Sequence, residues 1–101
     1  MPTYISLIKF TPDGLRTMKS AGAERIKVTK DNIERLGGQL KAVYHCLGRY
    51  DAVAIVDFAS NEAAMAASVA NGMAGHITIE TMPVFTQGEW HQVLDATVGR
   101  M

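Results

Sequence analysis

The sequence of 101 residues contains one cysteine, Cys46, and no excess charge of either sign. A single cysteine cannot form an internal disulfide, and Met1–Tyr4 enter a strand directly without the layout of a signal peptide, which together favour the cytoplasm. Ten basic and ten acidic residues cancel. Because the chain lacks the positive field that attracts a phosphate backbone, nucleic-acid binding is not favoured.

Long apolar runs and basic clusters are missing as well. The longest apolar runs have the length of a strand, well short of the roughly 20 residues of a spanning helix, and no basic cluster follows them, so no membrane role is supported. The sequence has no Gly-rich phosphate loop, nucleophile elbow or catalytic triad pattern. His45, His76 and His91 lie on separate predicted elements without metal-ligand spacing, so neither a metal nor a cofactor is predicted.

The central feature that is present is Gly48-Arg49-Tyr50-Asp51, followed by the apolar run of residues 52–58. This run has small, β-branched and aromatic residues and no Pro or Gly, which predicts a central strand covered on both faces. Gly48 can adopt positive φ and Asp51 can bond nearby backbone amides, so the preceding residues predict a tight turn. Alternatively, Arg49, Tyr50 and Asp51 project a donor, a phenol and a carboxylate into a shared cleft.

The whole chain predicts one α+β domain, residues 1–101, in which a strand–helix–strand unit occurs twice. Right-handed crossovers then give the ferredoxin-like βαββαβ fold: an antiparallel sheet in the order 4-1-3-2 with both helices on one face. The opposite face also carries apolar side chains, and we expect a second copy to cover it in a homodimer or an assembly of dimers. The sequence predicts strands at 3–10, 39–46, 52–58 and 76–82, helices at about 23–36, 60–71 and 86–97, and a shorter helix capped by Thr11.

Several finer expectations concern packing. If Leu47 faces Asp51 across the turn, Lys41 meets Asp57 and His45 lies on the sheet face that meets the second copy. Gly22 is expected to interrupt the helical region after Thr11, and Pro83 to end regular pairing of the last strand. Large apolar side chains are expected to point inward from the helices, namely Leu15, Met18, Met65 and Val69.

Three side chains have functional groups that can take part in chemistry. Asp57 in an apolar strand is costly alone, so we expect a pair with Lys41 or Lys9; an unpaired Asp57 would have a raised pKa and could act as a general base. His45 is expected to be a half-buried strand histidine bonded to a neighbour. No base lies near Cys46, which favours a small apolar role.

The central motif Leu47-Gly48-Arg49-Tyr50-Asp51 with its following strand resembles the GYD-domain family, as do Pro2–Leu7, Lys9–Thr11 and Leu36–Gly38. The Gly, Tyr and Asp of that family stand here as Gly48, Tyr50 and Asp51, and the resemblance runs from Pro2 to about Thr86. It implies a dimeric α/β-barrel related in fold to stress-responsive barrel proteins and small cofactorless monooxygenases, with no established activity. The turn at residues 59–61 departs from the pattern, because it lacks a Pro and an acidic pair.

Two functions follow as hypotheses. In the first, the chain is an oligomeric binding or structural module whose dimer cleft holds a small apolar or aromatic ligand. In the second, it is a cofactor-independent, monooxygenase-like enzyme that uses Tyr50, His45 and Asp51 or Asp57 around a cavity between helices and sheet. The absence of a catalytic signature favours the first hypothesis, because a fold alone does not imply a function.

Overall fold

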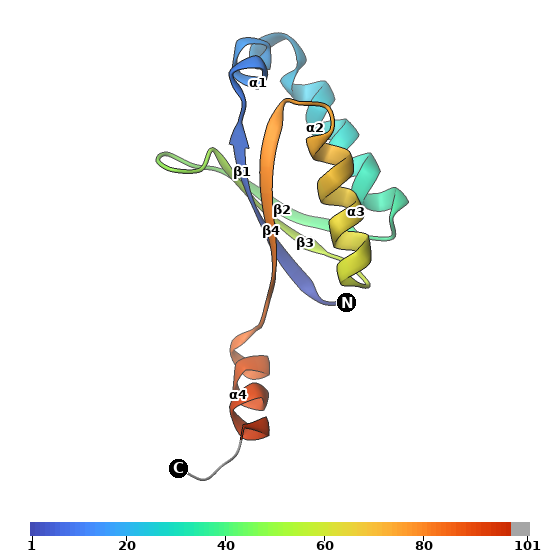
Figure 1. The fold of residues 1–101 in the computed structure, drawn as a ribbon, viewed down its shortest axis with the longest axis vertical. Coiled ribbons are helices and arrows are strands. Elements are labelled where there is room, and N and C mark those ends of the chain that lie inside the picture. The colour runs from blue at the N-terminus through green and yellow to red at the C-terminus, as the bar shows by residue number, and fades with distance from the viewer. Residues whose placement is uncertain (98–101) are drawn as a thin grey trace.

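The computed structural model describes residues 1–97 and has the α+β architecture expected from the sequence. The sheet is antiparallel with the order β2-β3-β1-β4, and Figure 1 shows α2 and α3 packed beside each other on one side of it. The fold class, the ferredoxin-like topology and the strand order are therefore confirmed. The elements of the described residues are β1 (Thr3–Phe10), α1 (Pro12–Arg16), α2 (Met18–Arg35), β2 (Gln39–His45), β3 (Ala52–Asp57), α3 (Asn61–Gly72), β4 (Ile77–Val84) and α4 (Gln87–Ala96).

Hydroxyl side chains fix where three of the helices begin. The Thr11 hydroxyl accepts a hydrogen bond from the Gly14 amide, and Ser60 and Thr86 cap α3 and α4 in the same way. Such caps satisfy amides that have no partner within the helix, so they set the first turn of each helix. Thr86 is also part of a reciprocal capping box with Glu89.

The expected interruption at Gly22 is wrong. The break falls at Thr17, and α2 runs without interruption from Met18 to Arg35. Gly22 is buried, and a β-carbon at this position would lie 2.8 Å from the Met18 sulfur. Close packing at Gly22 therefore outweighs the low helix propensity of glycine.

The core lies between the sheet and the inner sides of α2 and α3. Its buried side chains include the edge-to-face pair Tyr4 and Phe58, whose ring centroids are 5.7 Å apart. Ala64 and Ala67 are the buried positions of α3, which lets this helix approach the sheet closely. The expectation that Met65 and Val69 anchor α3 is wrong, because they are 66% and 51% exposed; Leu15 also points outward.

The expected register of β2 against β3 is wrong by one residue along most of the pair. Cys46, rather than Leu47, pairs with Asp51, so the turn is one residue longer at its N-terminal side. His45 consequently lies opposite Ala52, on the helix-covered face, and not on the open face. Beyond an irregularity between Leu40 and Ala42 the register differs by two residues, with Gln39 opposite Asp57. The Lys41 side chain still reaches Asp57 as expected, with Nζ 3.8 Å from Oδ2.

Strand β4 does not end before Pro83, which contradicts the expected stop. Pro83 pairs with Tyr4, and the strand continues to Val84. Because β4 is an edge strand, a residue without an amide hydrogen can be accommodated there without losing a central ladder bond.

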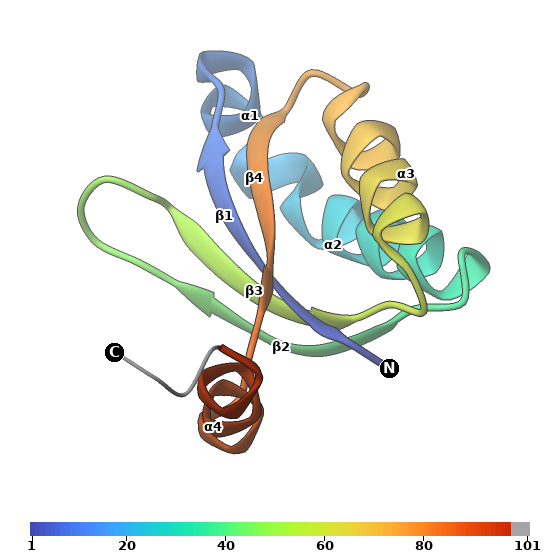
Figure 2. The ribbon, with the colours of Figure 1, turned by 60° about the horizontal axis from the view of Figure 1, so that its bottom comes forward.

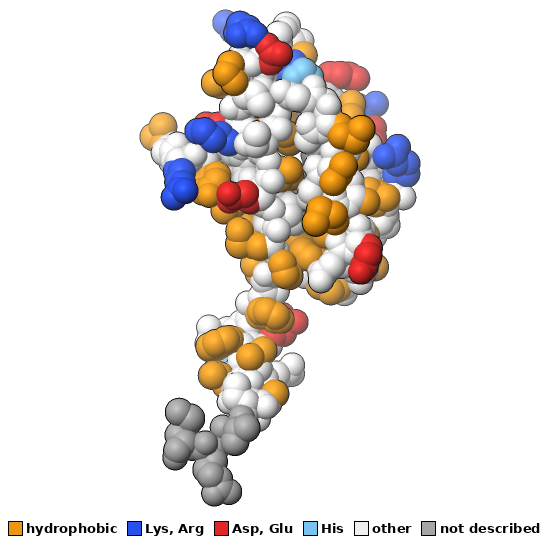
Figure 3. Space-filling model, viewed as in Figure 1, with side chains coloured by type: hydrophobic (Ala, Val, Ile, Leu, Met, Phe, Trp, Pro, Cys, Tyr) orange, Lys and Arg blue, Asp and Glu red, His pale blue; other side chains and the backbone are white. Residues whose placement is uncertain are grey.

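One face of the sheet is left uncovered by α1, α2 and α3 (Figure 2). We call it the open face, and its apolar positions are Ile5, Leu7, Ala42, Tyr44, Val53, Ile55, Met82 and Val84. Helix α4 projects past the end of β4, away from the other helices, and hydrophobic side chains line it in Figure 3. The molecule measures 57 × 31 × 19 Å, and within residues 1–97 no helix is long and apolar enough to cross a membrane.

The contact between α1 and the start of β4 leaves no room for a side chain at Gly14. A β-carbon there would overlap the carbonyl oxygen of His76. We therefore expect Gly14→Ala to lower the free energy of unfolding by about 1–3 kcal/mol, as overpacking does. Gly72→Ala is the control, because a β-carbon there meets nothing within 4 Å. Urea denaturation measures both variants, and equal stability of Gly14→Ala and the natural chain would contradict this packing.

Candidate functional site

The loop between β2 and β3 folds back over the end of β1. The Cys46 amide donates to the Asp51 carbonyl at 2.9 Å, and the Asp51 amide donates to the Ile8 carbonyl at 2.8 Å. The Asp51 carboxylate accepts a hydrogen bond from the Phe10 amide, with Oδ2 2.8 Å from the nitrogen. Asp51 thus extends the hydrogen bonding between β1 and β3 by one residue before β3 begins. Its carboxylate takes the place of a backbone carbonyl as the acceptor for the Phe10 amide.

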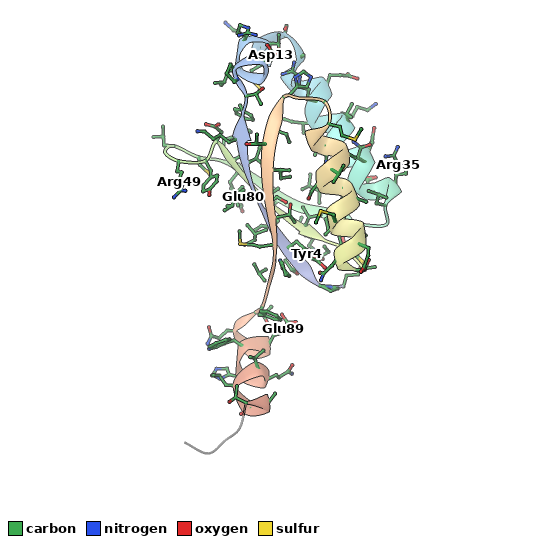
Figure 4. The ribbon with its side chains drawn as sticks, in the orientation of Figure 1. Tyr4, Asp13, Arg35, Arg49, Glu80 and Glu89 are labelled. Atoms are coloured by element: carbon green, nitrogen blue, oxygen red, sulfur yellow. The ribbon has the colours of Figure 1, made fainter. Side chains whose placement is uncertain are left out.

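Gly48 and Tyr50 direct this loop across the open face. Gly48 has φ of 112°, a conformation that favours glycine. The Tyr50 hydroxyl donates to Glu80 Oε2 on β4 at 2.9 Å, which ties the loop to the far edge strand. Figure 4 shows Arg49 on the loop and Glu80 on β4.

Charged groups surround the Tyr50 ring. The Arg49 guanidinium carbon lies 5.8 Å from the ring centroid, and Lys9 Nζ donates to the Arg49 carbonyl at 3.4 Å. The hydrogen bond to Glu80 raises the pKa of Tyr50; desolvation and the charge of Glu80 add to this rise, and Arg49 opposes it.

A shallow depression on the open face is lined by Leu7, Lys9, Arg49, Tyr50, Thr78, Ile79 and Glu80. It combines two cations, one carboxylate and one phenol, which suits polar recognition at the margin of an apolar surface.

The structure does not bring the other candidate residues to this depression. Asp57 lies at the opposite end of β3, where Thr3 Oγ1 donates to Oδ1 at 2.9 Å and Lys41 approaches Oδ2. Asp57 is therefore paired, as expected, and is not an isolated general base. His45 is exposed, so the expectation of a half-buried histidine is wrong; its ring lies beside Phe10, with centroids 6.4 Å apart. The Cys46 sulfur lies 3.9 Å from the Tyr44 carbonyl.

The enzyme hypothesis required Tyr50, His45 and Asp51 or Asp57 around one cavity. Tyr50 faces the open side, His45 the helix side, and Asp51 bonds backbone, so these groups do not form one site. Among residues 1–97, no three His, Cys, Asp or Glu side chains gather as metal ligands would. The sequence analysis did not identify Glu80 as the partner of Tyr50. Glu80 lies opposite Leu7 in the β1–β4 register, and a correct prediction of that register would have placed Glu80 on the open face near Tyr50.

Comparison with known proteins identifies the same family that the turn motif resembles. The sequence model of the GYD domain matches residues 4–94. The chain belongs to the GYD domain family. A Thermus thermophilus relative named "Glutamine synthetase and cystathionine beta-lyase binding protein" is 38% identical over 88 residues, which are 83% of this chain and 92% of the relative. The crystal structure of TTHA0845 from Thermus thermophilus is similar at 25% identity with a TM-score of 0.49, covering 85% of this chain and 95% of that one.

The contacts of Asp51 in this GYD domain generate a stability prediction. Asp51→Ala leaves the part-buried Phe10 amide without its acceptor, so we expect the free energy of unfolding to fall by roughly 1–3 kcal/mol. The control is Asp31→Ala on the exposed side of α2, which should change stability by no more than about 0.5 kcal/mol. Urea denaturation of both variants is the measurement. Unchanged stability of Asp51→Ala would show that Asp51 is not the link between loop and β1.

Proposed function

We propose that this GYD domain is an oligomeric protein-binding module that pairs with a second copy of itself through the open face. The observation that carries the proposal is the apolar surface on the side of the sheet that α1–α3 leave bare. Tyr44 is 63% exposed and Met82 38% exposed on this side, and the central side chains Ile5, Leu7 and Ile55 are only half-buried. Contiguous apolar surface of this kind marks an interaction site.

The surroundings of the open face support a copy of the same chain as its cover. The Tyr50–Glu80 pair with Arg49 lies toward one end of the face, and the Lys41–Asp57 pair lies toward the other. An apolar centre with a polar margin is the usual anatomy of a protein interface. Since both signs of charge occur at the margin, the surface can match itself about a two-fold axis.

The Thermus thermophilus relative supports a second kind of binding. Its name states that it binds glutamine synthetase and cystathionine beta-lyase. We propose that this chain also binds one of these enzymes, through the apolar side chains of α4. Trp90, Val93 and Leu94 are 48%, 38% and 44% exposed on this projecting helix, and tryptophan is enriched among residues that dominate binding energy.

The remaining parts of the proposal concern the cellular location and small ligands. Location in the cytoplasm stays a prediction from the sequence. A small apolar or aromatic ligand would occupy the space between α2 and the sheet, on the side opposite to the open face. The dispersed positions of Tyr50, His45 and Asp57 support binding over catalysis.

Self-pairing can be tested with a charge at the centre of the open face. We expect the natural chain to sediment as a dimer at micromolar concentration, with a melting temperature that rises with concentration. Ile55→Asp would bury unpaired carboxylates between the two sheets, at a cost of about 3 kcal/mol or more, so the dimer dissociation constant should rise at least about 100-fold.

Val69→Asp is the matched control, because Val69 is equally apolar but exposed on the outside of α3. This variant should remain a dimer. A natural chain that is a folded monomer at micromolar concentration would refute self-pairing.

Enzyme binding is tested with purified glutamine synthetase and cystathionine beta-lyase from the source organism of this chain. By biolayer interferometry we expect the immobilised chain to bind at least one enzyme, and Trp90→Ala to weaken binding by about 30-fold, as loss of a dominant interface residue does. His91→Ala, the adjacent position of α4, should bind normally. If neither enzyme binds, the proposed partners are wrong; if Trp90→Ala binds fully, α4 is not the contact surface.

A further inference from the structure

Three adjoining cavities border α2: two lie between this helix and the helix-covered face of the sheet, and one lies between α2, the end of α3 and the start of β4. Their volumes are about 70, 230 and 90 Å³, and Thr29 and Ile77 line all three. The first extends toward α3 and the core, and its lining includes Ile8, Ile33 and Val56. The apolar lining of the 230 Å³ cavity includes Val28, Ala70 and Ile77 beside polar residues, and this cavity exceeds the roughly 150 Å³ of a cavity that holds benzene. The space therefore accommodates a molecule with one aromatic ring.

Two nitrogen-bearing side chains border this space without a complete set of partners. His76 Nδ1 is buried and has no hydrogen-bond partner among residues 1–97. Arg25 is half-buried, and no carboxylate of the described residues lies within ion-pair distance of it. Its guanidinium donates to the Gly14 carbonyl at 3.2 Å and to the Thr17 hydroxyl, which leaves donors for another group. Both side chains line the 230 and the 90 Å³ cavities.

Three other polar side chains of the larger cavity are engaged or exposed. Asn32 Nδ2 donates to Asn71 Oδ1 at 2.9 Å, and Glu24 is an exposed residue of the lining. A ligand with an apolar ring and an acceptor group would contact the aliphatic side chains of the lining and would accept a hydrogen bond from His76 Nδ1.

We propose that this space is a binding site for a small aromatic carboxylate. Its ring would lie among the aliphatic side chains near Thr29 and Ile77, and its carboxylate would accept hydrogen bonds from Arg25 and from His76 Nδ1–H. Charge-assisted bonds of this kind are stronger than neutral ones. The proposal rests on the role of the chain as a binding module, and the site is independent of the open face and of α4.

Sodium benzoate is the probe, titrated into the full isotope-labelled chain and followed by NMR. We expect saturable shifts centred on Thr29, His76 and Ile77, with a dissociation constant below about 1 mM, which is reasonable for a ligand of this size. Benzyl alcohol has the same ring without the charge and should bind at least tenfold more weakly. Equal affinity for both molecules would overturn the assignment of a carboxylate, and no saturable binding of benzoate would overturn the site.

Two variants and two controls locate the binding. Arg25→Gln and His76→Phe should each weaken benzoate binding at least tenfold, whereas Arg16→Gln and His91→Phe alter exposed residues outside the cavities and should have no effect. Arg25→Gln decides the question if His76→Phe does not fold, and full binding by Arg25→Gln refutes the proposal. Sedimentation of the same samples reports self-pairing separately, so failure of benzoate binding is distinguishable from failure of the dimer.

Discussion

The structure depends on a sheet whose two central strands are apolar on both faces. Tyr4, Ala54 and Val56 point toward the helices, while Leu7 and Ile55 point the opposite way. Because neighbouring side chains of a strand alternate between faces, no arrangement of α2 and α3 can cover both sets. One layer of helices closes one face, and the other must be covered from outside the chain or stay in contact with water.

Gly48, Tyr50 and Asp51 make structural contacts in this chain. Gly48 permits the backbone turn, Tyr50 spans the open face to Glu80, and Asp51 bonds the Phe10 amide. These contacts connect the β2–β3 loop to β1 and β4, so one short segment links all four strands. These contacts hold the loop at the margin of the open face. They explain why a glycine, a tyrosine and an aspartate stand at these positions, and the explanation requires no catalysed reaction.

The sequence predicted the fold because its signals are local or strongly periodic, such as the Thr11–Pro12 helix start and the apolar run after Asp51. It failed where side-chain packing decides the outcome. Gly22 is a buried position within α2 next to the Met18 sulfur, and alanines rather than Met65 face the core. The β2–β3 register differs by one residue near the turn because Cys46 pairs with Asp51, which reverses the face of His45. The Tyr50–Glu80 contact joins residues 30 positions apart, and only the register of β4 reveals it.

The composition of the core connects folding to association. Eight hydrophobic residues of the described chain are buried, and four of them are alanines: Ala52, Ala54, Ala64 and Ala67. Burying an alanine side chain removes little apolar area from water. The core between the helices and the sheet therefore contributes less stabilisation than a core of larger side chains would. The larger apolar side chains of the open face are half-buried or exposed in one copy, and burying them in the proposed dimer would add stabilisation. Folding and the proposed pairing would then be one equilibrium that depends on concentration.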